Sequence, residues 1–166
     1  MSLRQGLLLF LGAVASIMIF ARVGLAAGQP NYSGKYSLKA PKSKHDGSSL
    51  EVAQTPESIE VTTVDQGNRT TIRYPLDGSK AECSAPQGAS GTCTGHFSGK
   101  ELILEWTAVA LSRPDAKPTR THRVDRWSLS KDARKLTIET HFDFPDLTAM
   151  TAGDSSPKVY VRLGNP

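Results

Sequence analysis

Residues 122–143, HRVDRWSLSKDARKLTIETHFD, decide the fold class of this 166-residue chain. Apolar and polar residues alternate on both sides of the central polar run SKDAR. Alternation with a period of two is the pattern of a half-buried β-strand, and a short polar link between two such runs is typical of an antiparallel hairpin. The stretch therefore predicts two antiparallel strands joined by a turn over residues 130–134.

The same stretch predicts the register of this hairpin. If Leu129 lies opposite Leu136, then Trp127 lies opposite Ile138, and one face is apolar near the turn. The remaining pairs are Asp125 with Thr140, Arg123 with Phe142, Arg126 with Glu139 and His122 with Asp143. A slip of one residue would mix the apolar and polar faces, so this register is favoured.

Similar alternating runs recur along the chain, and none shows helical periodicity. We count eight strands, at residues 35–39, 59–63, 70–74, 95–97, 102–106, 127–129, 136–142 and 159–163. Most links are short and contain Gly or Asp, whereas residues 40–56 and 112–119 form longer polar connections. The sequence predicts an all-β fold, an eight-stranded antiparallel up-and-down barrel, with a β-sandwich as the alternative because it shows the same alternation.

The first 26 residues have the pattern of a secretory signal peptide. Arg4 precedes an apolar run over residues 7–20, and small residues around Ala26 fit the positions that a signal peptidase recognises. A membrane anchor is the alternative, but the run is shorter than the roughly 20 residues of a spanning helix, and Arg22 interrupts its continuation. We expect export to the periplasm or the exterior, and a single β-barrel domain over residues 27–166 with no stable membrane span.

The chain has two cysteines, Cys83 and Cys93. An exported protein folds in an oxidising compartment, so we predict a disulfide between them. Two free thiols are the alternative.

Charge and motifs exclude several classes of function. The net charge is +4, and without Arg4 and Arg22 the chain keeps 18 basic against 16 acidic residues, with no dense basic run. We therefore expect no nucleic-acid partner. No metal-site spacing, nucleophile elbow or phosphate loop occurs, so we assign no catalytic residue, metal or cofactor and favour a non-enzymatic role. We interpret Glu139, His141 and Asp143 as an exposed polar face rather than a metal site.

Gly34-Lys35-Tyr36 opens the first predicted strand. In this it resembles the lipocalins and their relatives, the calycins, which open with Gly-x-Trp and continue with seven more antiparallel strands. Tyr36 stands at the tryptophan position, and the resemblance extends over most of residues 31–164. It implies a barrel fold, whose known members mostly bind small hydrophobic molecules inside, while some are enzymes or inhibitors.

The resemblance also implies which side chains face the interior. They are Tyr36, Ile59, Val61, Ile72, Tyr74, Leu104, Trp106, Trp127, Ile138 and Phe142, accompanied by Leu38 and Val161. In the fatty-acid-binding branch a Tyr and an Arg near the last strand hold a carboxylate, but Tyr160 and Arg162 differ in order and spacing. We expect Val159, Val161 and Leu163 of this strand to face inward instead.

This inward set allows two interpretations, a ligand cavity or a packed core. The leading hypothesis is an exported lipocalin-like protein that binds a small hydrophobic or amphipathic ligand. One alternative is an envelope-associated interaction domain with a filled core, acting through the loops at residues 40–56 and 112–119. Another is an enzyme with polar residues at the barrel mouth. The sequence names no protein partner.

Overall fold

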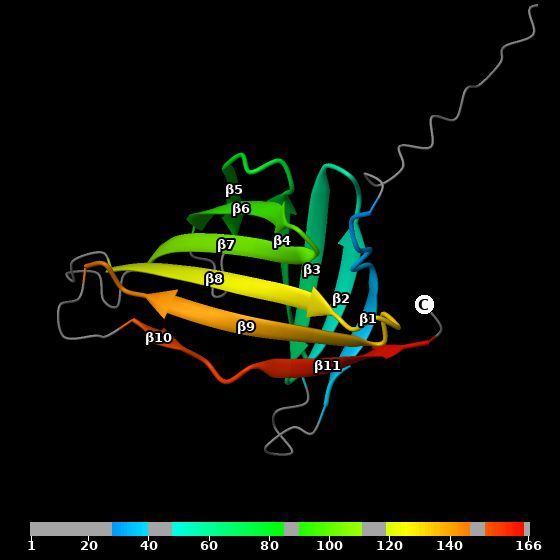
Figure 1. The fold of residues 1–166 in the computed structure, drawn as a ribbon. Coiled ribbons are helices and arrows are strands. Elements are labelled where there is room, and N and C mark those ends of the chain that lie inside the picture. Colours follow the sequence, from blue (N-terminus) through cyan, green and yellow to red (C-terminus); the bar gives the residue numbers. More distant parts are fainter. Residues whose placement is uncertain (1–27, 40–47, 85–89, 111–118, 147–151, 165–166) are drawn as a thin grey trace, which may run out of the picture.

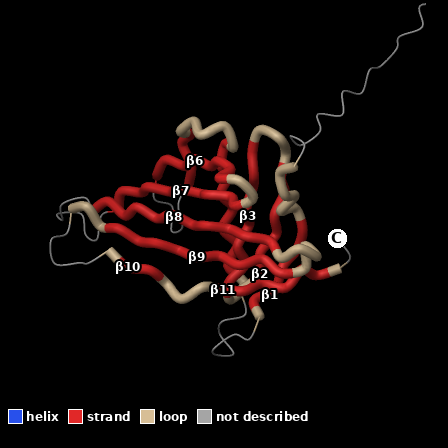
Figure 2. The backbone as a smooth tube through the Cα atoms, viewed as in Figure 1, coloured by secondary structure: helices blue, strands red, loops and turns tan. Residues whose placement is uncertain are grey.

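The computed structural model describes residues 28–39, 48–84, 90–110, 119–146 and 152–164 (Figure 1). These residues form strands and connections, and no helix occurs among them (Figure 2). Consequently no helix in this part of the chain is long and apolar enough to cross a membrane. The predicted signal peptide lies outside the described residues, as do residues 40–47 and 112–118 of the two long connections.

The structure has eleven strands, which form one antiparallel sheet. They are β1 (Gly34–Leu38), β2 (Ser49–Gln54), β3 (Ser58–Asp65), β4 (Asn68–Pro75), β5 (Ala81–Ser84), β6 (Ser90–Ser98), β7 (Glu101–Ala110), β8 (Thr119–Leu129), β9 (Lys135–Asp143), β10 (Gly153–Asp154) and β11 (Lys158–Leu163). Their order in the sheet is β4-β3-β2-β1-β11-β9-β8-β7-β6-β5, with β10 beside β9. The sheet bends on itself, so that β6–β9 run across the view in Figure 1 while β1–β3 run steeply up it.

The two ends of this sheet approach each other where the chain leaves β4 and passes β6. The Gly78 amide donates to the Gly95 carbonyl oxygen at 3.0 Å. A Cβ on Gly95 would lie 2.8 Å from the Pro75 carbonyl oxygen, so only glycine permits this close approach. The sheet is thus a nearly closed barrel, and a two-sheet sandwich does not describe it.

The prediction of an antiparallel barrel is confirmed, but the predicted number of strands, eight, is wrong. The sequence predicts a polar connection over residues 40–56, where the structure has β2, whose only buried side chains are Leu50 and Val52. The four residues of β5 include no β-branched or aromatic side chain, and β10 has only two residues. In β6, glycines occupy inward positions and hide the alternation.

The predicted register of the β8–β9 hairpin is confirmed. Leu129 pairs with Leu136, Trp127 with Ile138, Asp125 with Thr140, Arg123 with Phe142, Arg126 with Glu139 and His122 with Asp143. The turn closes with a 2.9 Å hydrogen bond from the Ser130 amide to the Lys135 carbonyl oxygen. Because alternate residues of a strand face opposite sides, this register places Arg123, Asp125 and Trp127 on the inner face.

The two ends of the barrel differ in how completely they are filled. We call the end with the β6–β7 and β8–β9 turns the closed end, and the end with the β3–β4 turn the mouth. The chain before β1 packs into the closed end, where Tyr32, Tyr36, Leu102 and Leu136 are completely buried. Completely buried side chains thus gather at the closed end, and Phe97 and Leu129 beside them are partly buried.

Candidate ligand-binding site inside the barrel

The predicted inward residues fall into two groups. Seven are buried in the core, namely Tyr36, Ile59, Val61, Tyr74, Leu104, Trp127 and Ile138. The other three, Ile72, Trp106 and Phe142, share the inner face with them but are only half-buried. Ile72 lies closer to the mouth than the buried Tyr74, and Phe142 lies closer to it than the buried Thr140. Trp106 lies between the buried Leu104 and Ala108. Leu38, Ile72 and Trp106 each pack against the buried core with part of their side chain.

The prediction for the last strand is wrong. Val161, assigned to the interior from its apolar side chain, is 37% exposed on the outer face, and Leu163 is 56% exposed. Tyr160 is buried instead, and Arg162 shares its face because it pairs directly with Tyr36. The alternation of apolar residues predicts the wrong inner face for this strand, because Arg162 has hydrogen-bond acceptors inside the barrel.

Arg162 fastens the chain before β1 to the last strand. Its Nη1 donates to the Ser33 carbonyl oxygen at 2.8 Å, and its Nη2 donates to the Asn31 carbonyl oxygen at 3.3 Å. Nη2 also donates to the Tyr36 hydroxyl at 2.7 Å, and the guanidinium lies 5.1 Å from the centre of the Tyr36 ring. These contacts engage the arginine at the closed end, with the backbone and with a residue of the core.

Gly34 makes room for this arrangement. It has φ of +151°, and a Cβ at this position would lie 3.3 Å from Arg162 Nη1. A side chain at this position would crowd Arg162, which explains the glycine of the Gly-x-Tyr motif.

Tyr32 completes the closed end. Its hydroxyl lies 2.9 Å from the Trp127 carbonyl oxygen and 3.0 Å from that of Lys100. Its ring meets the Trp127 ring edge-on at 6.1 Å and lies 6.3 Å from that of Phe97. Burial raises the pKa of Tyr32 to about 12, so the phenol stays neutral and remains a donor.

Halfway toward the mouth, the inner face of β8 carries a charged pair. Arg123 donates from Nε to Asp125 Oδ1 at 2.9 Å, and its Nη2 lies 2.8 Å from Oδ2. The Thr140 hydroxyl of β9 donates to the same carboxylate at 2.6 Å. The Asp125 side chain is only 7% exposed, whereas that of Arg123 is 39% exposed. Two-point binding of this kind fixes both side chains and satisfies the buried carboxylate.

Aromatic residues surround the pair. The Arg123 guanidinium lies 5.7 Å from the centre of the Phe142 ring. Burial raises the pKa of the Tyr74 and Tyr160 phenols. The negative charge of Asp125 raises both pKa values further, and the positive charge of Arg123 lowers them. Both tyrosines are therefore neutral polar groups. The mouth half of the interior combines Ile72, Trp106 and Phe142 with this polar cluster.

Sequence reasoning did not select Arg123, Asp125 or Thr140 as site residues, although it placed them correctly in the register. Their signal was available, because three polar residues at inward positions of an otherwise apolar hairpin face need partners there. The pattern could not show that they partner one another.

The described residues contain no cluster of three or more His, Cys, Asp or Glu side chains suited to a metal ion. His141 Nδ1 lies 2.7 Å from Asp154 Oδ1 on the outer face, and His122 Nε2 lies 3.6 Å from Glu105. Neither contact lies on the inner face.

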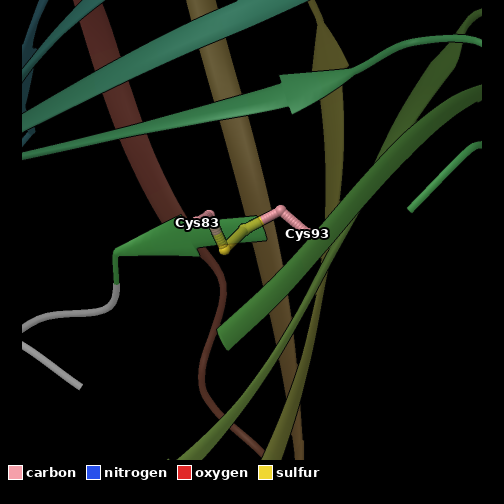
Figure 3. Close-up of a disulfide and its surroundings, with 2 residues drawn as sticks. All are labelled: Cys83 and Cys93. Carbon is pink, nitrogen blue, oxygen red and sulfur yellow. A yellow bond between two sulfur atoms is a disulfide. The ribbon is translucent and has the colours of Figure 1, made fainter. Parts of the chain in front are cut away.

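The predicted disulfide is present. Cys83 of β5 and Cys93 of β6 are bonded, with their Cα atoms 5.9 Å apart (Figure 3). Closing a loop of this length stabilises a fold by about 2–3 kcal/mol. Near the bond, an open groove of about 590 Å³ includes Thr92, Thr107 and Val109 in its lining. Thr107 and Val109 alternate with the inward Trp106 and Ala108, so the groove is largely on the outer face and is not the predicted interior site.

The fold was compared with known proteins. A solved structure described as the REP1-NXSQ fatty acid transporter superposes with a TM-score of 0.52 at 11% identity, covering 81% of this chain and 97% of that one. A tyrosine-to-phenylalanine mutant of the transporter gives 0.50 at 11% identity, covering 79% and 97%. Apo lipid binding protein 8 of Caenorhabditis elegans gives 0.48 at 8% identity, covering 80% and 95%.

No family profile matches the sequence, and neither does any protein with a curated description. At such low identities, the likeness to the fatty acid transporter concerns the fold alone. Together with the nearly closed antiparallel sheet, it shows that this chain has the same type of β-barrel fold as that transporter.

Proposed function

We propose that this chain is an exported barrel protein that binds a small hydrophobic or amphipathic molecule in the mouth half of its interior. The observation that carries the proposal is the contrast between Tyr32, Tyr36, Leu102 and Leu136, which are completely buried at the closed end, and the half-buried Ile72, Trp106 and Phe142. Inward-facing apolar side chains normally pack against one another at crystal-like density. Where they stay accessible, an apolar ligand can cover them.

The apolar walls and the polar cluster would contribute differently. Burying each CH₂ group of a ligand stabilises a complex by about 0.8 kcal/mol, so a chain of several carbons outweighs a single hydrogen bond of about 1 kcal/mol. Affinity would therefore come from Trp106 and its apolar neighbours. Arg123, whose side chain is 39% exposed, would orient the polar end of the ligand.

The named function of the similar structure supports this proposal. The fatty acid transporter shares the barrel over 81% of this chain, and its name describes a hydrophobic cargo with one polar end. A hydrophobic molecule with one polar end would fit an interior that combines aromatic side chains with one polar cluster.

The export part of the proposal is supported by the N-terminal sequence and by the disulfide. Residues 1–26 have the signal-peptide pattern, and a bond such as Cys83–Cys93 is typical of oxidising compartments. The expected mature protein begins at residue 27 and comprises one barrel domain. The mass of the protein recovered from the exported fraction of its host tests this directly.

The two tryptophans of the chain offer a matched test of ligand binding. Trp106 is half-buried in the mouth half, whereas Trp127 is 2% exposed at the closed end. In the Trp127→Phe variant only Trp106 remains, and we expect its emission to shift to the blue when a long-chain lipid is added. In the Trp106→Phe variant only Trp127 remains, and its emission should stay constant.

Folding of both variants would be checked by circular dichroism before the titration. Equal shifts in the two variants would place binding elsewhere or indicate a global change. No shift in either, together with a bare mature mass by native mass spectrometry, would contradict ligand binding and favour the interaction domain with a filled core.

A further inference from the structure

The charged pair of β8 is a buried anion with an accessible cation. The Asp125 carboxylate is covered on the inner face, held by Arg123 and by the Thr140 hydroxyl. We infer that the ligand carries an uncharged polar head with an oxygen acceptor, such as an alcohol or an ester, rather than a carboxylate. This inference rests on the ligand-binding function proposed above.

Arg123 can still donate to a ligand. A guanidinium has five N–H donors, and its two contacts with Asp125 use one on Nε and one on Nη2. Its side chain is 39% exposed, so a molecule inside the mouth half can reach it. Because arginine only donates, the group it meets must be an acceptor, as a hydroxyl, ester or amide oxygen is.

The charge of Asp125 decides between a neutral and an anionic acceptor. A carboxylate beside Arg123 would lie close to the Asp125 carboxylate as well, and the repulsion would offset most of the attraction. It would also lose its hydration, which is far more costly for an ion than for a neutral hydroxyl. A neutral oxygen keeps the hydrogen bond without either penalty.

Other charges near the inner face do not reverse this balance. Arg162 is engaged at the closed end with the backbone and Tyr36. Lys158, in register with Ile138 at the start of β11, is exposed, where solvent screens its charge. Asp65 adds negative charge near Tyr160. Among the described residues of the mouth half, then, the one partly buried cation that a carboxylate could meet is Arg123, and Asp125 compensates its charge. Arg162, whose partners are all neutral, lies at the closed end.

The test uses two ligands that differ only in the head group. Dodecan-1-ol and dodecanoic acid compete for the protein with the uncharged dye N-phenyl-1-naphthylamine at about pH 8, where the acid is ionised. We expect the alcohol to bind the wild-type protein at least about tenfold more tightly than the acid, because a like charge beside Asp125 is strongly unfavourable.

Replacing the anion should reverse the preference. Asp125→Asn keeps the size of the side chain and an acceptor for Arg123 and Thr140, while it leaves the arginine charge uncompensated. We expect affinity for the acid to rise at least about tenfold and affinity for the alcohol to change little. Glu139→Gln is the matched control, because it makes the same change in net charge on the exposed outer face of β9. It should leave both affinities unchanged.

The outcomes separate this inference from the proposed function. Tighter or equal binding of the acid by the wild-type protein would overturn the inference while ligand binding stands. If neither the dye nor either competitor binds, the proposed function fails and the inference with it. The comparison of the alcohol with the acid on the wild-type protein tests the inference even if Asp125→Asn does not fold.

Discussion

Arg162 and Arg123 both lie on the inner face of the barrel, yet Arg162 is engaged at the closed end and the side chain of Arg123 is 39% exposed. Arg162 donates to neutral acceptors, two backbone carbonyls and the Tyr36 hydroxyl, and the ring beneath it is completely buried. Arg123 pairs with a carboxylate, and the Phe142 ring beneath it is half-buried. The burial of the neighbouring ring, rather than the residue type, separates the two roles.

This difference implies that the closed end contributes mainly to stability and the mouth half mainly to binding. The closed end joins β1, β11 and the chain before β1, so its contacts link the first and last parts of the barrel. The mouth half leaves aromatic and polar side chains reachable. We therefore expect substitutions at the closed end to lower the free energy of unfolding, and substitutions in the mouth half to act mainly on binding.

The largest expected effect is at Tyr32. Tyr32→Ala removes a completely buried ring and its hydrogen bond, and we expect it to lower the free energy of unfolding by about 3–5 kcal/mol. Urea unfolding followed by circular dichroism measures this change. Thr121→Ala, at a half-buried inward position near the mouth, is the control and should change stability by no more than about 0.5 kcal/mol. Similar losses of unfolding free energy in both variants would mean that the two ends contribute equally to stability.

A smaller effect distinguishes the two arginines. Arg123→Met leaves the Asp125 carboxylate buried without its counterion, so we expect a loss of about 2–3 kcal/mol, below the full value for a buried pair because the arginine is partly exposed. Arg162→Met loses hydrogen bonds to neutral acceptors, and we expect a loss of about 1–2 kcal/mol.

Rescue by Asp125→Asn sharpens this contrast. Added to Arg123→Met, it removes the unpaired charge and should restore at least half of the lost stability. Added to Arg162→Met, it should restore nothing, because the two residues share no contact in the described structure. Equal rescue in both backgrounds, measured by urea unfolding in a double-mutant cycle, would show that the arginines belong to one network.

The fold class and one hairpin register could be predicted from the sequence because both depend on local alternation. Trp127 and Ile138 pair as predicted since only this register keeps the apolar residues on one face. β2 and β5 could not be predicted in the same way. β5 has only four residues, and only Leu50 and Val52 of β2 are buried. Pairing with neighbouring strands rather than their own composition holds both strands, and the Cys83–Cys93 bond also fixes β5.

The last strand shows a second limit. Its valines favour one face by hydropathy, but Tyr160 and Arg162 occupy the interior because Ser33, Asn31 and Tyr36 supply acceptors there. Those partners come from the other end of the sequence, so a local pattern cannot contain them. The same holds for the candidate site, where the apolar residues follow from alternation but the pairing of Arg123 with Asp125 does not.

The smallest expected effect concerns alkaline pH and returns to the closed end. The ordinary pKa of a tyrosine is 10.0, and burial raises that of Tyr32 to about 12 in the folded chain. Above pH 10 the unfolded chain therefore loses this proton while the folded chain keeps it, so the contribution is complete below pH 10 and declines as the pH rises toward 12. Between about pH 9 and pH 11 the wild-type protein should lose about 1 kcal/mol more stability than Tyr32→Phe, which has no phenol to ionise.

Urea unfolding of both proteins over this pH range measures the difference, and the other tyrosines cancel because both proteins contain them. An equal decline in the two would show that solvent reaches the Tyr32 hydroxyl and that the closed end is not sealed. A steeper decline in the wild-type protein would show that the Tyr32 phenol, which donates to the Trp127 carbonyl oxygen, is protected from solvent in the folded protein. The measurement is made without ligand, so it tests the burial of Tyr32 at the closed end independently of any binding in the mouth half.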